Sequence, residues 1–398
     1  MALIGCLLLV LIGVVAWFVE MGSDPLRAWR IYLVNFLFFT GIGVGGVLFV
    51  CVVNTASGAW ARNVKRVAEG LGIFLPVSFV LFLLMLPGLK TLLPWVEHPY
   101  GPAWYLNLCF LTWRDVIGIL VLALLGVYII YLSLRVDFGY EKEEGEGRDG
   151  PLSRFLTRGW KGTNAEAAVA RRRLVVLSPV YAILFALVLT VIGVDLIMSL
   201  KAEWYSTLIG AYYFVGCFYT SLAALLLAVI WTRRKYGLEG EIGPKHFHDI
   251  AMLTMGFGIV TGDFFYTQLF VIWYVNLPVE TSFLIDRMGD TPWRMIGILV
   301  LLLCFALPLL ASLRRSLKQR AVPMAVFAVA VLCAMWIERF LLIGPSVTGS
   351  ESILFGPMEV LVSLGFLGLL GTTFLLFIQR VPPVVLRDPI FDDPGETR

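Results

Sequence analysis

The sequence predicts an all-α, polytopic membrane protein with about ten transmembrane helices. Of its 398 residues, 59% are hydrophobic and 15% are charged, against roughly 45–50% and 25% in an ordinary soluble domain. The mean hydropathy is +0.86, and the chain contains 28 Phe and 12 Trp residues. One water-soluble core cannot bury this much apolar surface, which excludes a soluble globular protein.

Ten apolar runs are each long enough to cross a bilayer, which takes about 20 residues. The first run has no basic residue before it, and Cys6 comes too early for a lipoprotein signal, so we interpret this run as a retained helix. The ten runs lie at approximately 2–19, 28–53, 67–87, 115–134, 174–198, 207–232, 250–276, 293–313, 321–343 and 355–379.

The distribution of Lys and Arg predicts the orientation of these spans. One set of loops holds 23 of the 31 basic residues; it comprises 54–66, 135–173, 233–245, 314–320 and the tail after Gln379. By the positive-inside rule this set is cytoplasmic. We therefore expect both termini in the cytoplasm. The long loop 135–173 is interpreted as a solvated connector, with a cytoplasmic partner surface as the alternative.

An internal repeat predicts two four-helix bundles. The segment 113–122, WRDVIGILVL, recurs with one residue missing at 293–301, WRMIGILVL, and each copy begins a span on the outer side. Weaker matches place spans 2–5 over spans 6–9, which relates the halves by an axis along the membrane normal. The predicted divisions are a first peripheral helix at 1–26, bundles at 27–200 and 201–344, and a last helix with its tail at 345–398.

The few histidines and cysteines exclude several redox cofactors. None of the three histidines lies inside a long apolar run, so the usual axial ligands of a two-haem bundle are missing. The six cysteines never form a C-x-x-C motif, which disfavours an iron–sulfur or zinc site. We expect no haem, iron–sulfur cluster or metal in this chain. The net charge of +3 is too small to indicate nucleic acid as a partner.

Acidic residues inside the spans are costly and suggest function. Asp195 lies near the outer end of span 5, Glu338 at a similar depth in span 9, and Glu359 just inside span 10. Asp263 is closer to the middle of span 7, with Tyr266 and Gln268 on the next turn. These groups form either a proton relay or interhelical hydrogen bonds and ion pairs, and the sequence leaves both open.

The motif His246-Phe247-His248-Asp249 begins span 7. Two histidines at i and i+2 point to different faces of a helix, which disfavours a metal site. The sequence leaves two alternatives, a route by which protons pass from the cytoplasm toward Asp263, and an ordinary helix start with Asp249 in the first turn.

A second polar cluster precedes span 4 on the outer side, with Trp104, Asn107, Trp113, Arg114 and Asp115. Trp at this level is commonly an interfacial belt residue. The alternative is a quinone site, which needs a flat apolar slot, a few polar groups at the carbonyls and an acid or base. Asn35 and Phe39, in an aromatic stretch of span 2, complete the proposed quinone-binding set, and Asp115 or Asp195 would exchange protons.

Three runs resemble one known family. They are 27–46, RAWRIYLVNFLFFTGIGVGG, then 203–207 with 212–214, and 268–281, QLFVIWYVNLPVET. From Arg27 to about Arg380 the chain resembles the NrfD/PsrC family, the polysulfide reductase membrane subunits. The closest resemblance is to ten-helix members, the ActF-type of alternative complex III and the QrcD-type of the quinone reductase complex.

The resemblance implies an integral subunit without its own redox centre that meets menaquinone or ubiquinone near the periplasmic face. An iron–sulfur subunit, often with a multihaem cytochrome c, would exchange electrons there, beside other membrane subunits. The family places its quinone pocket in the first bundle, which favours Asn35, Arg114 and Asp115. Some members carry a His where this chain has Phe39, so His-mediated quinone ligation is not expected.

We therefore predict a quinone-interacting membrane subunit of a bacterial respiratory oxidoreductase in the inner membrane, with proton translocation as an activity that the buried acids allow. The first alternative is an ActF-like scaffold that conducts protons without a functional quinone site. A secondary transporter is the second alternative, and it requires broken helices at corresponding positions in the two halves.

Overall fold

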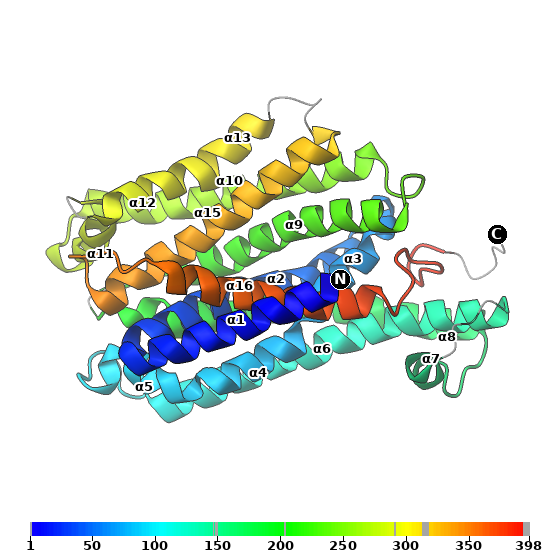
Figure 1. The fold of residues 1–398 in the computed structure, drawn as a ribbon, viewed down its shortest axis with the longest axis horizontal. Coiled ribbons are helices and arrows are strands. Elements are labelled where there is room, and N and C mark those ends of the chain that lie inside the picture. The colour runs from blue at the N-terminus through cyan, green and yellow to red at the C-terminus, as the bar shows by residue number, and fades with distance from the viewer. Residues whose placement is uncertain are drawn as a thin grey trace.

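The computed structural model describes residues 2–145, 147, 150–202, 204–289, 292–312 and 318–392. Within these ranges the chain is helical and contains no strand. Ten helices are long and apolar enough to cross a membrane. The predicted fold class, an all-α polytopic membrane protein, is confirmed (Figure 1). Parts of the predicted basic loop 314–320 and of the tail lie outside the described residues.

The first bundle surrounds α2 (Pro25–Thr55), which is buried along almost its whole length. Around it pack α3 (Arg62–Gly72), α4 (Leu75–Met85), α6 (Leu108–Glu143) and α8 (Thr163–Leu196). Two glycines of α2 bring it close to the second bundle. A Cβ at Gly41 would lie 2.9 Å from Cys217 Sγ, and one at Gly45 would lie 2.4 Å from Ser221 Cβ. Small residues therefore set the contact between the bundles.

The second bundle is built on α9 (Ile209–Tyr236), which packs against both α2 and α8 of the first bundle. Its other members are α10 (Pro244–Val275), α15 (Ala321–Thr348) and a segmented span. The segmented span runs from α12 (Trp293–Val300) through a π-helix (Leu301–Ala306) into α13 (Leu307–Ser312).

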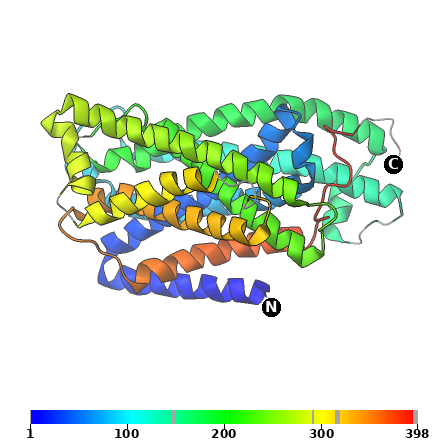
Figure 2. The same ribbon diagram turned by 90° about the horizontal axis from the view of Figure 1, so that it is seen from above.

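The first and last spans, α1 (Ala2–Ser23) and α16 (Pro357–Ile378), pack against each other. Gly13 and Gly365 meet at their crossing, where a Cβ on Gly13 would lie 2.4 Å from the Cα of Gly365. Figure 2 shows the pair along one side of the bundle, with α8 on the other side. The exposed face of α1 is apolar, and side chains such as Ile4, Leu11 and Phe18 are more than half exposed, as expected of a helix that faces lipid.

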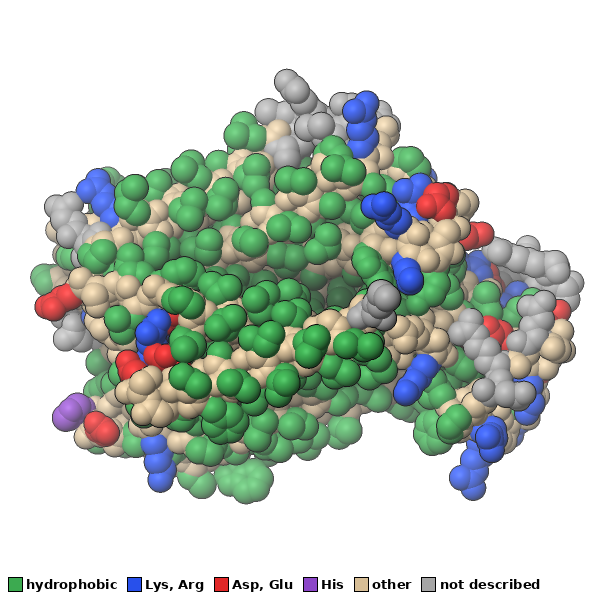
Figure 3. Space-filling model, viewed as in Figure 1, with side chains coloured by type: hydrophobic (Ala, Val, Ile, Leu, Met, Phe, Trp, Pro, Cys, Tyr) green, Lys and Arg blue, Asp and Glu red, His purple; other side chains and the backbone are tan. Residues whose placement is uncertain are grey.

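The molecule has two polar ends separated by a broad apolar surface (Figure 3). One end, which we call the basic end, carries α7 (Pro151–Leu156), the start of α3 and the C-terminal segment, residues 381–392. The opposite end carries α5 (Leu89–Leu92), the loop 93–107 and α11 (Pro278–Met288) (Figure 1). The connector predicted at 135–173 is shorter than expected, because α6 continues to Glu143 and α8 begins at Thr163.

Within the described residues, the third and the eighth spans are interrupted. The third breaks at a turn, Ile73 and Phe74, just before Pro76, and the eighth contains the π-helix. In the repeat, span 3 corresponds to span 7 and span 4 to span 8. The transporter alternative requires interruptions at corresponding positions in the two halves. The two interruptions seen here do not correspond in this way.

Candidate functional site

The ends of α6 and α8 are joined by an ion pair at the opposite end of the bundle. Arg114 Nε lies 2.5 Å from Asp195 Oδ2, and Arg114 Nη2 lies 2.5 Å from Asp195 Oδ1. Arg114 Nη1 also donates to the backbone carbonyl of Tyr105, at 3.1 Å. The guanidinium lies over the ring of Tyr105, 3.8 Å from its centroid. This parallel two-bond geometry fixes the carboxylate as well as neutralising it.

Asp115 completes the cluster from the next position of α6. Its side chain is 1% exposed, and among the residues that the structure describes none donates a hydrogen bond to either carboxyl oxygen. It interacts with the carboxyl of Asp195, which is close enough to hydrogen-bond when one of the two carries a proton. One guanidinium thus faces two buried carboxyl groups. With both ionised the cluster carries one uncompensated negative charge, and a proton bound there removes that charge.

The loop before α6 covers this cluster. Burial, with a further contribution from the charge of Asp195, raises the pKa of Tyr105 to about 12, so its hydroxyl stays protonated at neutral pH. Tyr100 donates to the carbonyl of Ser199 at 2.6 Å and so ties the loop to the end of α8.

Three residues predicted for the outer polar cluster, Trp104, Asn107 and Trp113, do not join Arg114, Asp115 and Asp195. Asn107 caps α6, and its side-chain oxygen accepts from the backbone of Cys109 and Phe110 at 3.1 and 3.2 Å. The side chains of Trp104 and Trp113 are 76% and 62% exposed. This exposure is typical of interfacial belt residues.

Asn35 does not lie with Arg114 and Asp115. It is fully buried, it donates to the carbonyl of Ile31 at 2.9 Å, and its oxygen accepts from Trp336 Nε1 at 3.0 Å. Both atoms of the side-chain amide are therefore engaged, and its direct neighbour on the second bundle is Trp336 of α15.

Trp336 and Phe39 line an apolar cleft between α2, α9, α15 and α16, with a volume of about 860 Å³. The hollow is visible near the centre of the face in Figure 3. Its walls are aliphatic and aromatic, with Ser363 among the few polar side chains. The cleft borders α16, whereas the Arg114 cluster borders α8, and these helices lie on different sides of the bundle (Figure 2). The sequence-predicted quinone set is thus divided between two places.

Glu359 binds two arginines at the start of α2. Its carboxylate accepts from Arg27 at 2.7 and 2.8 Å and from Arg30 at 2.9 Å. Both Glu359 and Arg30 are fully buried. This arrangement corresponds to the ion-pair alternative for Glu359.

Glu338 lies in the second bundle beside Arg339, which contacts it at 2.8 Å. The Tyr212 hydroxyl donates to Glu338 at 2.5 Å, and the guanidinium of Arg339 lies 4.8 Å from the ring centroid of Tyr213. All four side chains are at least 98% buried. A buried acid with a phenol donor can hold either a charge or a proton. The trio of Tyr212, Glu338 and Arg339 therefore remains a candidate for proton movement.

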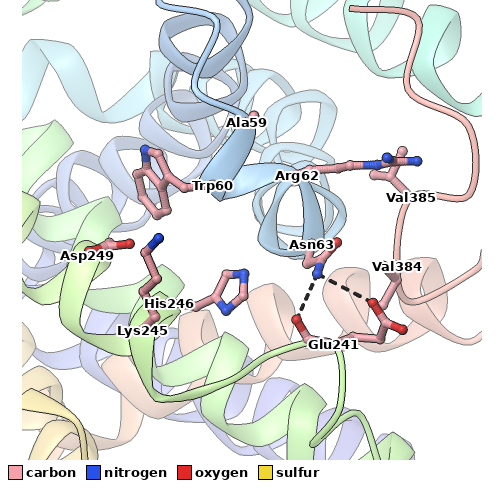
Figure 4. A pocket seen from close by; sticks show the side chains of 10 residues that line it. All are labelled: Ala59, Trp60, Arg62, Asn63, Glu241, Lys245, His246, Asp249, Val384 and Val385. Carbon is pink, nitrogen blue, oxygen red and sulfur yellow. Dashed lines mark hydrogen bonds between the residues drawn. The ribbon is translucent and has the colours of Figure 1, made fainter. Parts of the chain in front are cut away.

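The histidine motif lies at a polar pocket of about 310 Å³ at the basic end. Figure 4 shows His246 and Asp249 of α10 facing Asn63 of α3 across this pocket, with the C-terminal segment on its far wall. Asn63 donates to the carbonyl of Glu241 at 2.7 Å, and His246 Nδ1 accepts from the backbone of Gly243 at 3.1 Å. The Nδ1 atom of His248 is buried and makes no hydrogen bond with any described residue.

The predicted proton route from the histidine motif toward Asp263 does not continue along α10. Gln268 is half-buried and accepts from Ser206 at 2.9 Å. Asp263 and Tyr266 are instead exposed on the side of the helix that faces away from the bundle. The structure brings neither of them together with Asp249 or Glu338.

The sequence-based prediction missed a buried ionic network at the basic end. Arg66 pairs with Glu69 and with Asp137 of α6, and Lys65 binds Asp388 at 2.8 Å. All five side chains are fully buried. Asp137 also accepts from the backbone of Arg387 at 2.9 Å, which fastens the C-terminal segment to the first bundle. The i, i+3 pair Arg66 and Glu69 was the available signal.

The fold, its apolar surface and its buried ionic clusters define a polytopic helical membrane subunit. The family profile described as "Polysulphide reductase, NrfD" matches residues 20–349. The chain belongs to this NrfD family. Its members are generally quinone-interacting membrane subunits of reductase complexes, and they usually pair with iron–sulfur subunits. No curated protein matches the chain.

Proposed function

We propose that this chain is the quinone-interacting subunit of a bacterial inner-membrane respiratory oxidoreductase, and that the Arg114, Asp115 and Asp195 cluster serves the quinone ring. The single observation that carries the proposal is Asp115, a buried acid beside an ion pair that receives no hydrogen bond from the described part of the chain. Such a group is a place where a proton can be held and released. Menaquinone and ubiquinone both fit this chemistry.

Each residue then has a defined share of the reaction. Reduction of a quinone takes up two electrons and two protons, and oxidation returns them. Electrons would pass to or from an iron–sulfur subunit, together with a multihaem cytochrome c. These partners would dock at the end opposite the basic end. With both chain termini in the cytoplasm, that end would be periplasmic. Arg114 would orient a carbonyl oxygen, while Asp115, partnered by Asp195, would exchange the two protons one after the other, gaining or losing a proton to the aqueous side between the two steps. Tyr105, which stays protonated, would close the site toward water.

The proposal predicts different effects for Asp115 and its neighbours. In the intact complex Asp115→Asn keeps the shape but cannot exchange a proton, so turnover with a short-chain quinone should fall roughly a hundredfold while its KM changes little. Glu97→Gln, a change in an exposed loop at the same end, is the matched control. Unchanged turnover in Asp115→Asn would remove this residue from the mechanism.

The second candidate is a proton-conducting scaffold with the quinone bound elsewhere in the complex. Two observations support it: the buried Tyr212, Glu338 and Arg339 trio, and the polar pocket with His246 and Asp249. Under this alternative Glu338→Gln lowers proton translocation by complexes in liposomes, whereas Arg114→Gln leaves quinone affinity unchanged. The proposed quinone site requires the opposite result for Arg114→Gln.

A further inference from the structure

Asp263 lies on the side of α10 that faces away from the rest of the bundle. The carboxyl is exposed and makes no hydrogen bond or ion pair with any residue that the structure describes. It follows Pro244, the first residue of the helix, by 19 positions and precedes Val275, the last, by 12. At 1.5 Å per residue it is about 28 Å and about 18 Å from the two helix ends. This depth places it within the hydrocarbon layer rather than at a membrane surface.

The face around Asp263 differs from a face that meets lipid. One line of exposed residues on α10 recurs every three or four positions: Met252, Gly256, Ile259, Asp263, Tyr266, Phe270 and Tyr274. Val260, Val271, Trp273 and Val275 are exposed beside it. Tyr266, Phe270 and Tyr274 stack along the helix with ring centroids 6.0 Å apart. In contrast, the exposed positions of α1 from Ala2 to Val19 are aliphatic or Phe, apart from Gly5.

Gly256 gives this face a point of close approach. A Cβ built on it meets nothing within 4 Å, so another helix can reach the backbone there. Small residues of this kind, with polar groups nearby, are typical of helix–helix interfaces in membranes.

A carboxyl facing lipid is unfavourable, by about 2.5–3.5 kcal/mol for Asp at a helix centre on insertion scales. A second copy of the chain does not relieve this cost, because a two-fold interface on this face sets Asp263 near Asp263. We infer that the α10 face, defined by the seven residues above, binds a transmembrane helix of another subunit that carries a Lys or Arg side chain opposite Asp263. Charge complementarity across this face selects the partner.

The test uses the whole complex, purified from membranes through a tag on this chain. A photo-crosslinking amino acid at position 266 should join this chain to an integral subunit, and the crosslinked peptide should come from a membrane segment with a basic residue. The matched control is position 183 of α8, which is also exposed and should yield no such adduct. An adduct with a second copy, or with lipid alone, would overturn the inference.

Substitutions at Asp263 separate a subunit interface from a lipid-facing surface. Asp263→Leu removes an unfavourable group if the face meets lipid, so the complex would keep every subunit and gain stability. If the face binds a basic helix, Asp263→Leu and Asp263→Lys should each lower the amount of that integral subunit in the purified complex at least fivefold, with Asp263→Asn intermediate.

The iron–sulfur subunit and quinone labelling of the Arg114 cluster should stay unchanged in these variants. This inference therefore stands or falls separately from the proposed quinone site. Full retention of the integral subunit in both Asp263→Leu and Asp263→Lys would contradict it.

Discussion

Arg114 holds Asp195 with two parallel hydrogen bonds of 2.5 Å, which join the ends of α6 and α8 at one end of the first bundle. The adjacent residue, Asp115, has no such partner within the described ranges of the chain. One basic group thus serves two buried acids. The proposed function rests on this unequal pairing, because it leaves one carboxyl available for a proton.

The first prediction concerns the geometry of this pair. Arg114→Lys keeps the positive charge but cannot form the two-bond contact. We expect kcat/KM for quinone to fall roughly tenfold, equivalent to about 1.4 kcal/mol, when turnover of the intact complex is measured. Arg294→Lys is the control, since Arg294 is the counterpart in the internal repeat and is exposed. Equal kinetics in Arg114→Lys and wild type would argue against a role for the bidentate contact.

A second prediction concerns Glu359, which neutralises Arg27 and Arg30. Glu359→Gln leaves the fully buried Arg30 without a carboxylate, and such a loss costs about 3–5 kcal/mol. We expect the free energy of unfolding, measured by titration with a denaturing detergent, to fall by that amount. Glu351→Gln, at an exposed position nearby, should change it little. Similar stabilities for the two variants would show that Glu359 is not needed to compensate the arginines.

A third prediction concerns Arg287 and Pro345. Proline has no N–H, so Pro345 leaves the carbonyl of Leu341 without its helical donor; Arg287 Nε donates to that carbonyl at 3.1 Å instead, and Nη2 to Leu342 at 2.6 Å. Arg287→Met should therefore lower the free energy of unfolding by about 2–3 kcal/mol. In a double-mutant cycle Pro345→Ala should recover part of this loss, because it restores the N–H. Strict additivity would contradict the pairing.

A fourth prediction concerns pH and the C-terminal segment. Burial alone would raise the pKa of Asp388, but the charge and hydrogen bond of Lys65 bring that pKa below its ordinary value. A lowered pKa stabilises the attached segment above the unfolded pKa, near 3.9, and this contribution disappears as the pH falls through the lower folded value. Hydrogen exchange of residues 381–392, corrected for intrinsic rates, should therefore accelerate below about pH 4.

Asp388→Asn is the corresponding variant. It should release residues 381–392 already at pH 7 and remove the acid-dependent step in exchange. Protection at pH 7 equal to that of wild type would show that the contact between Lys65 and Asp388 does not hold the segment.

The sequence was sufficient to predict the number and approximate limits of the spans, because the length of an apolar run is set by bilayer thickness. It could not predict which face of a span is covered. Lipid and protein interior are both apolar, so periodicity does not separate them. For this reason Asp263 was predicted as part of an internal route, yet it lies on an exposed face.

The candidate site was predicted in part. Arg114, Asp115 and Asp195 were selected as charges near span ends, and the structure brings them together. Asn35 was selected with them but bonds to Trp336, because its partner comes from a helix about 300 residues away in sequence, which local pattern does not reveal. The contacts of Lys65 with Asp388 and of Arg66 with Asp137 were missed for the same reason, although the adjacent pair Arg66 and Glu69 is local.

Photolabelling of the intact complex with an azidoquinone tests the central claim most directly. The proposed site predicts labelled peptides from residues 100–118 and 190–205, around Arg114 and Asp195, with labelling reduced by excess unlabelled quinone and by Arg114→Gln. Labelling confined to the apolar cleft between α15 and α16, or to another subunit, and unchanged in Arg114→Gln, would contradict it.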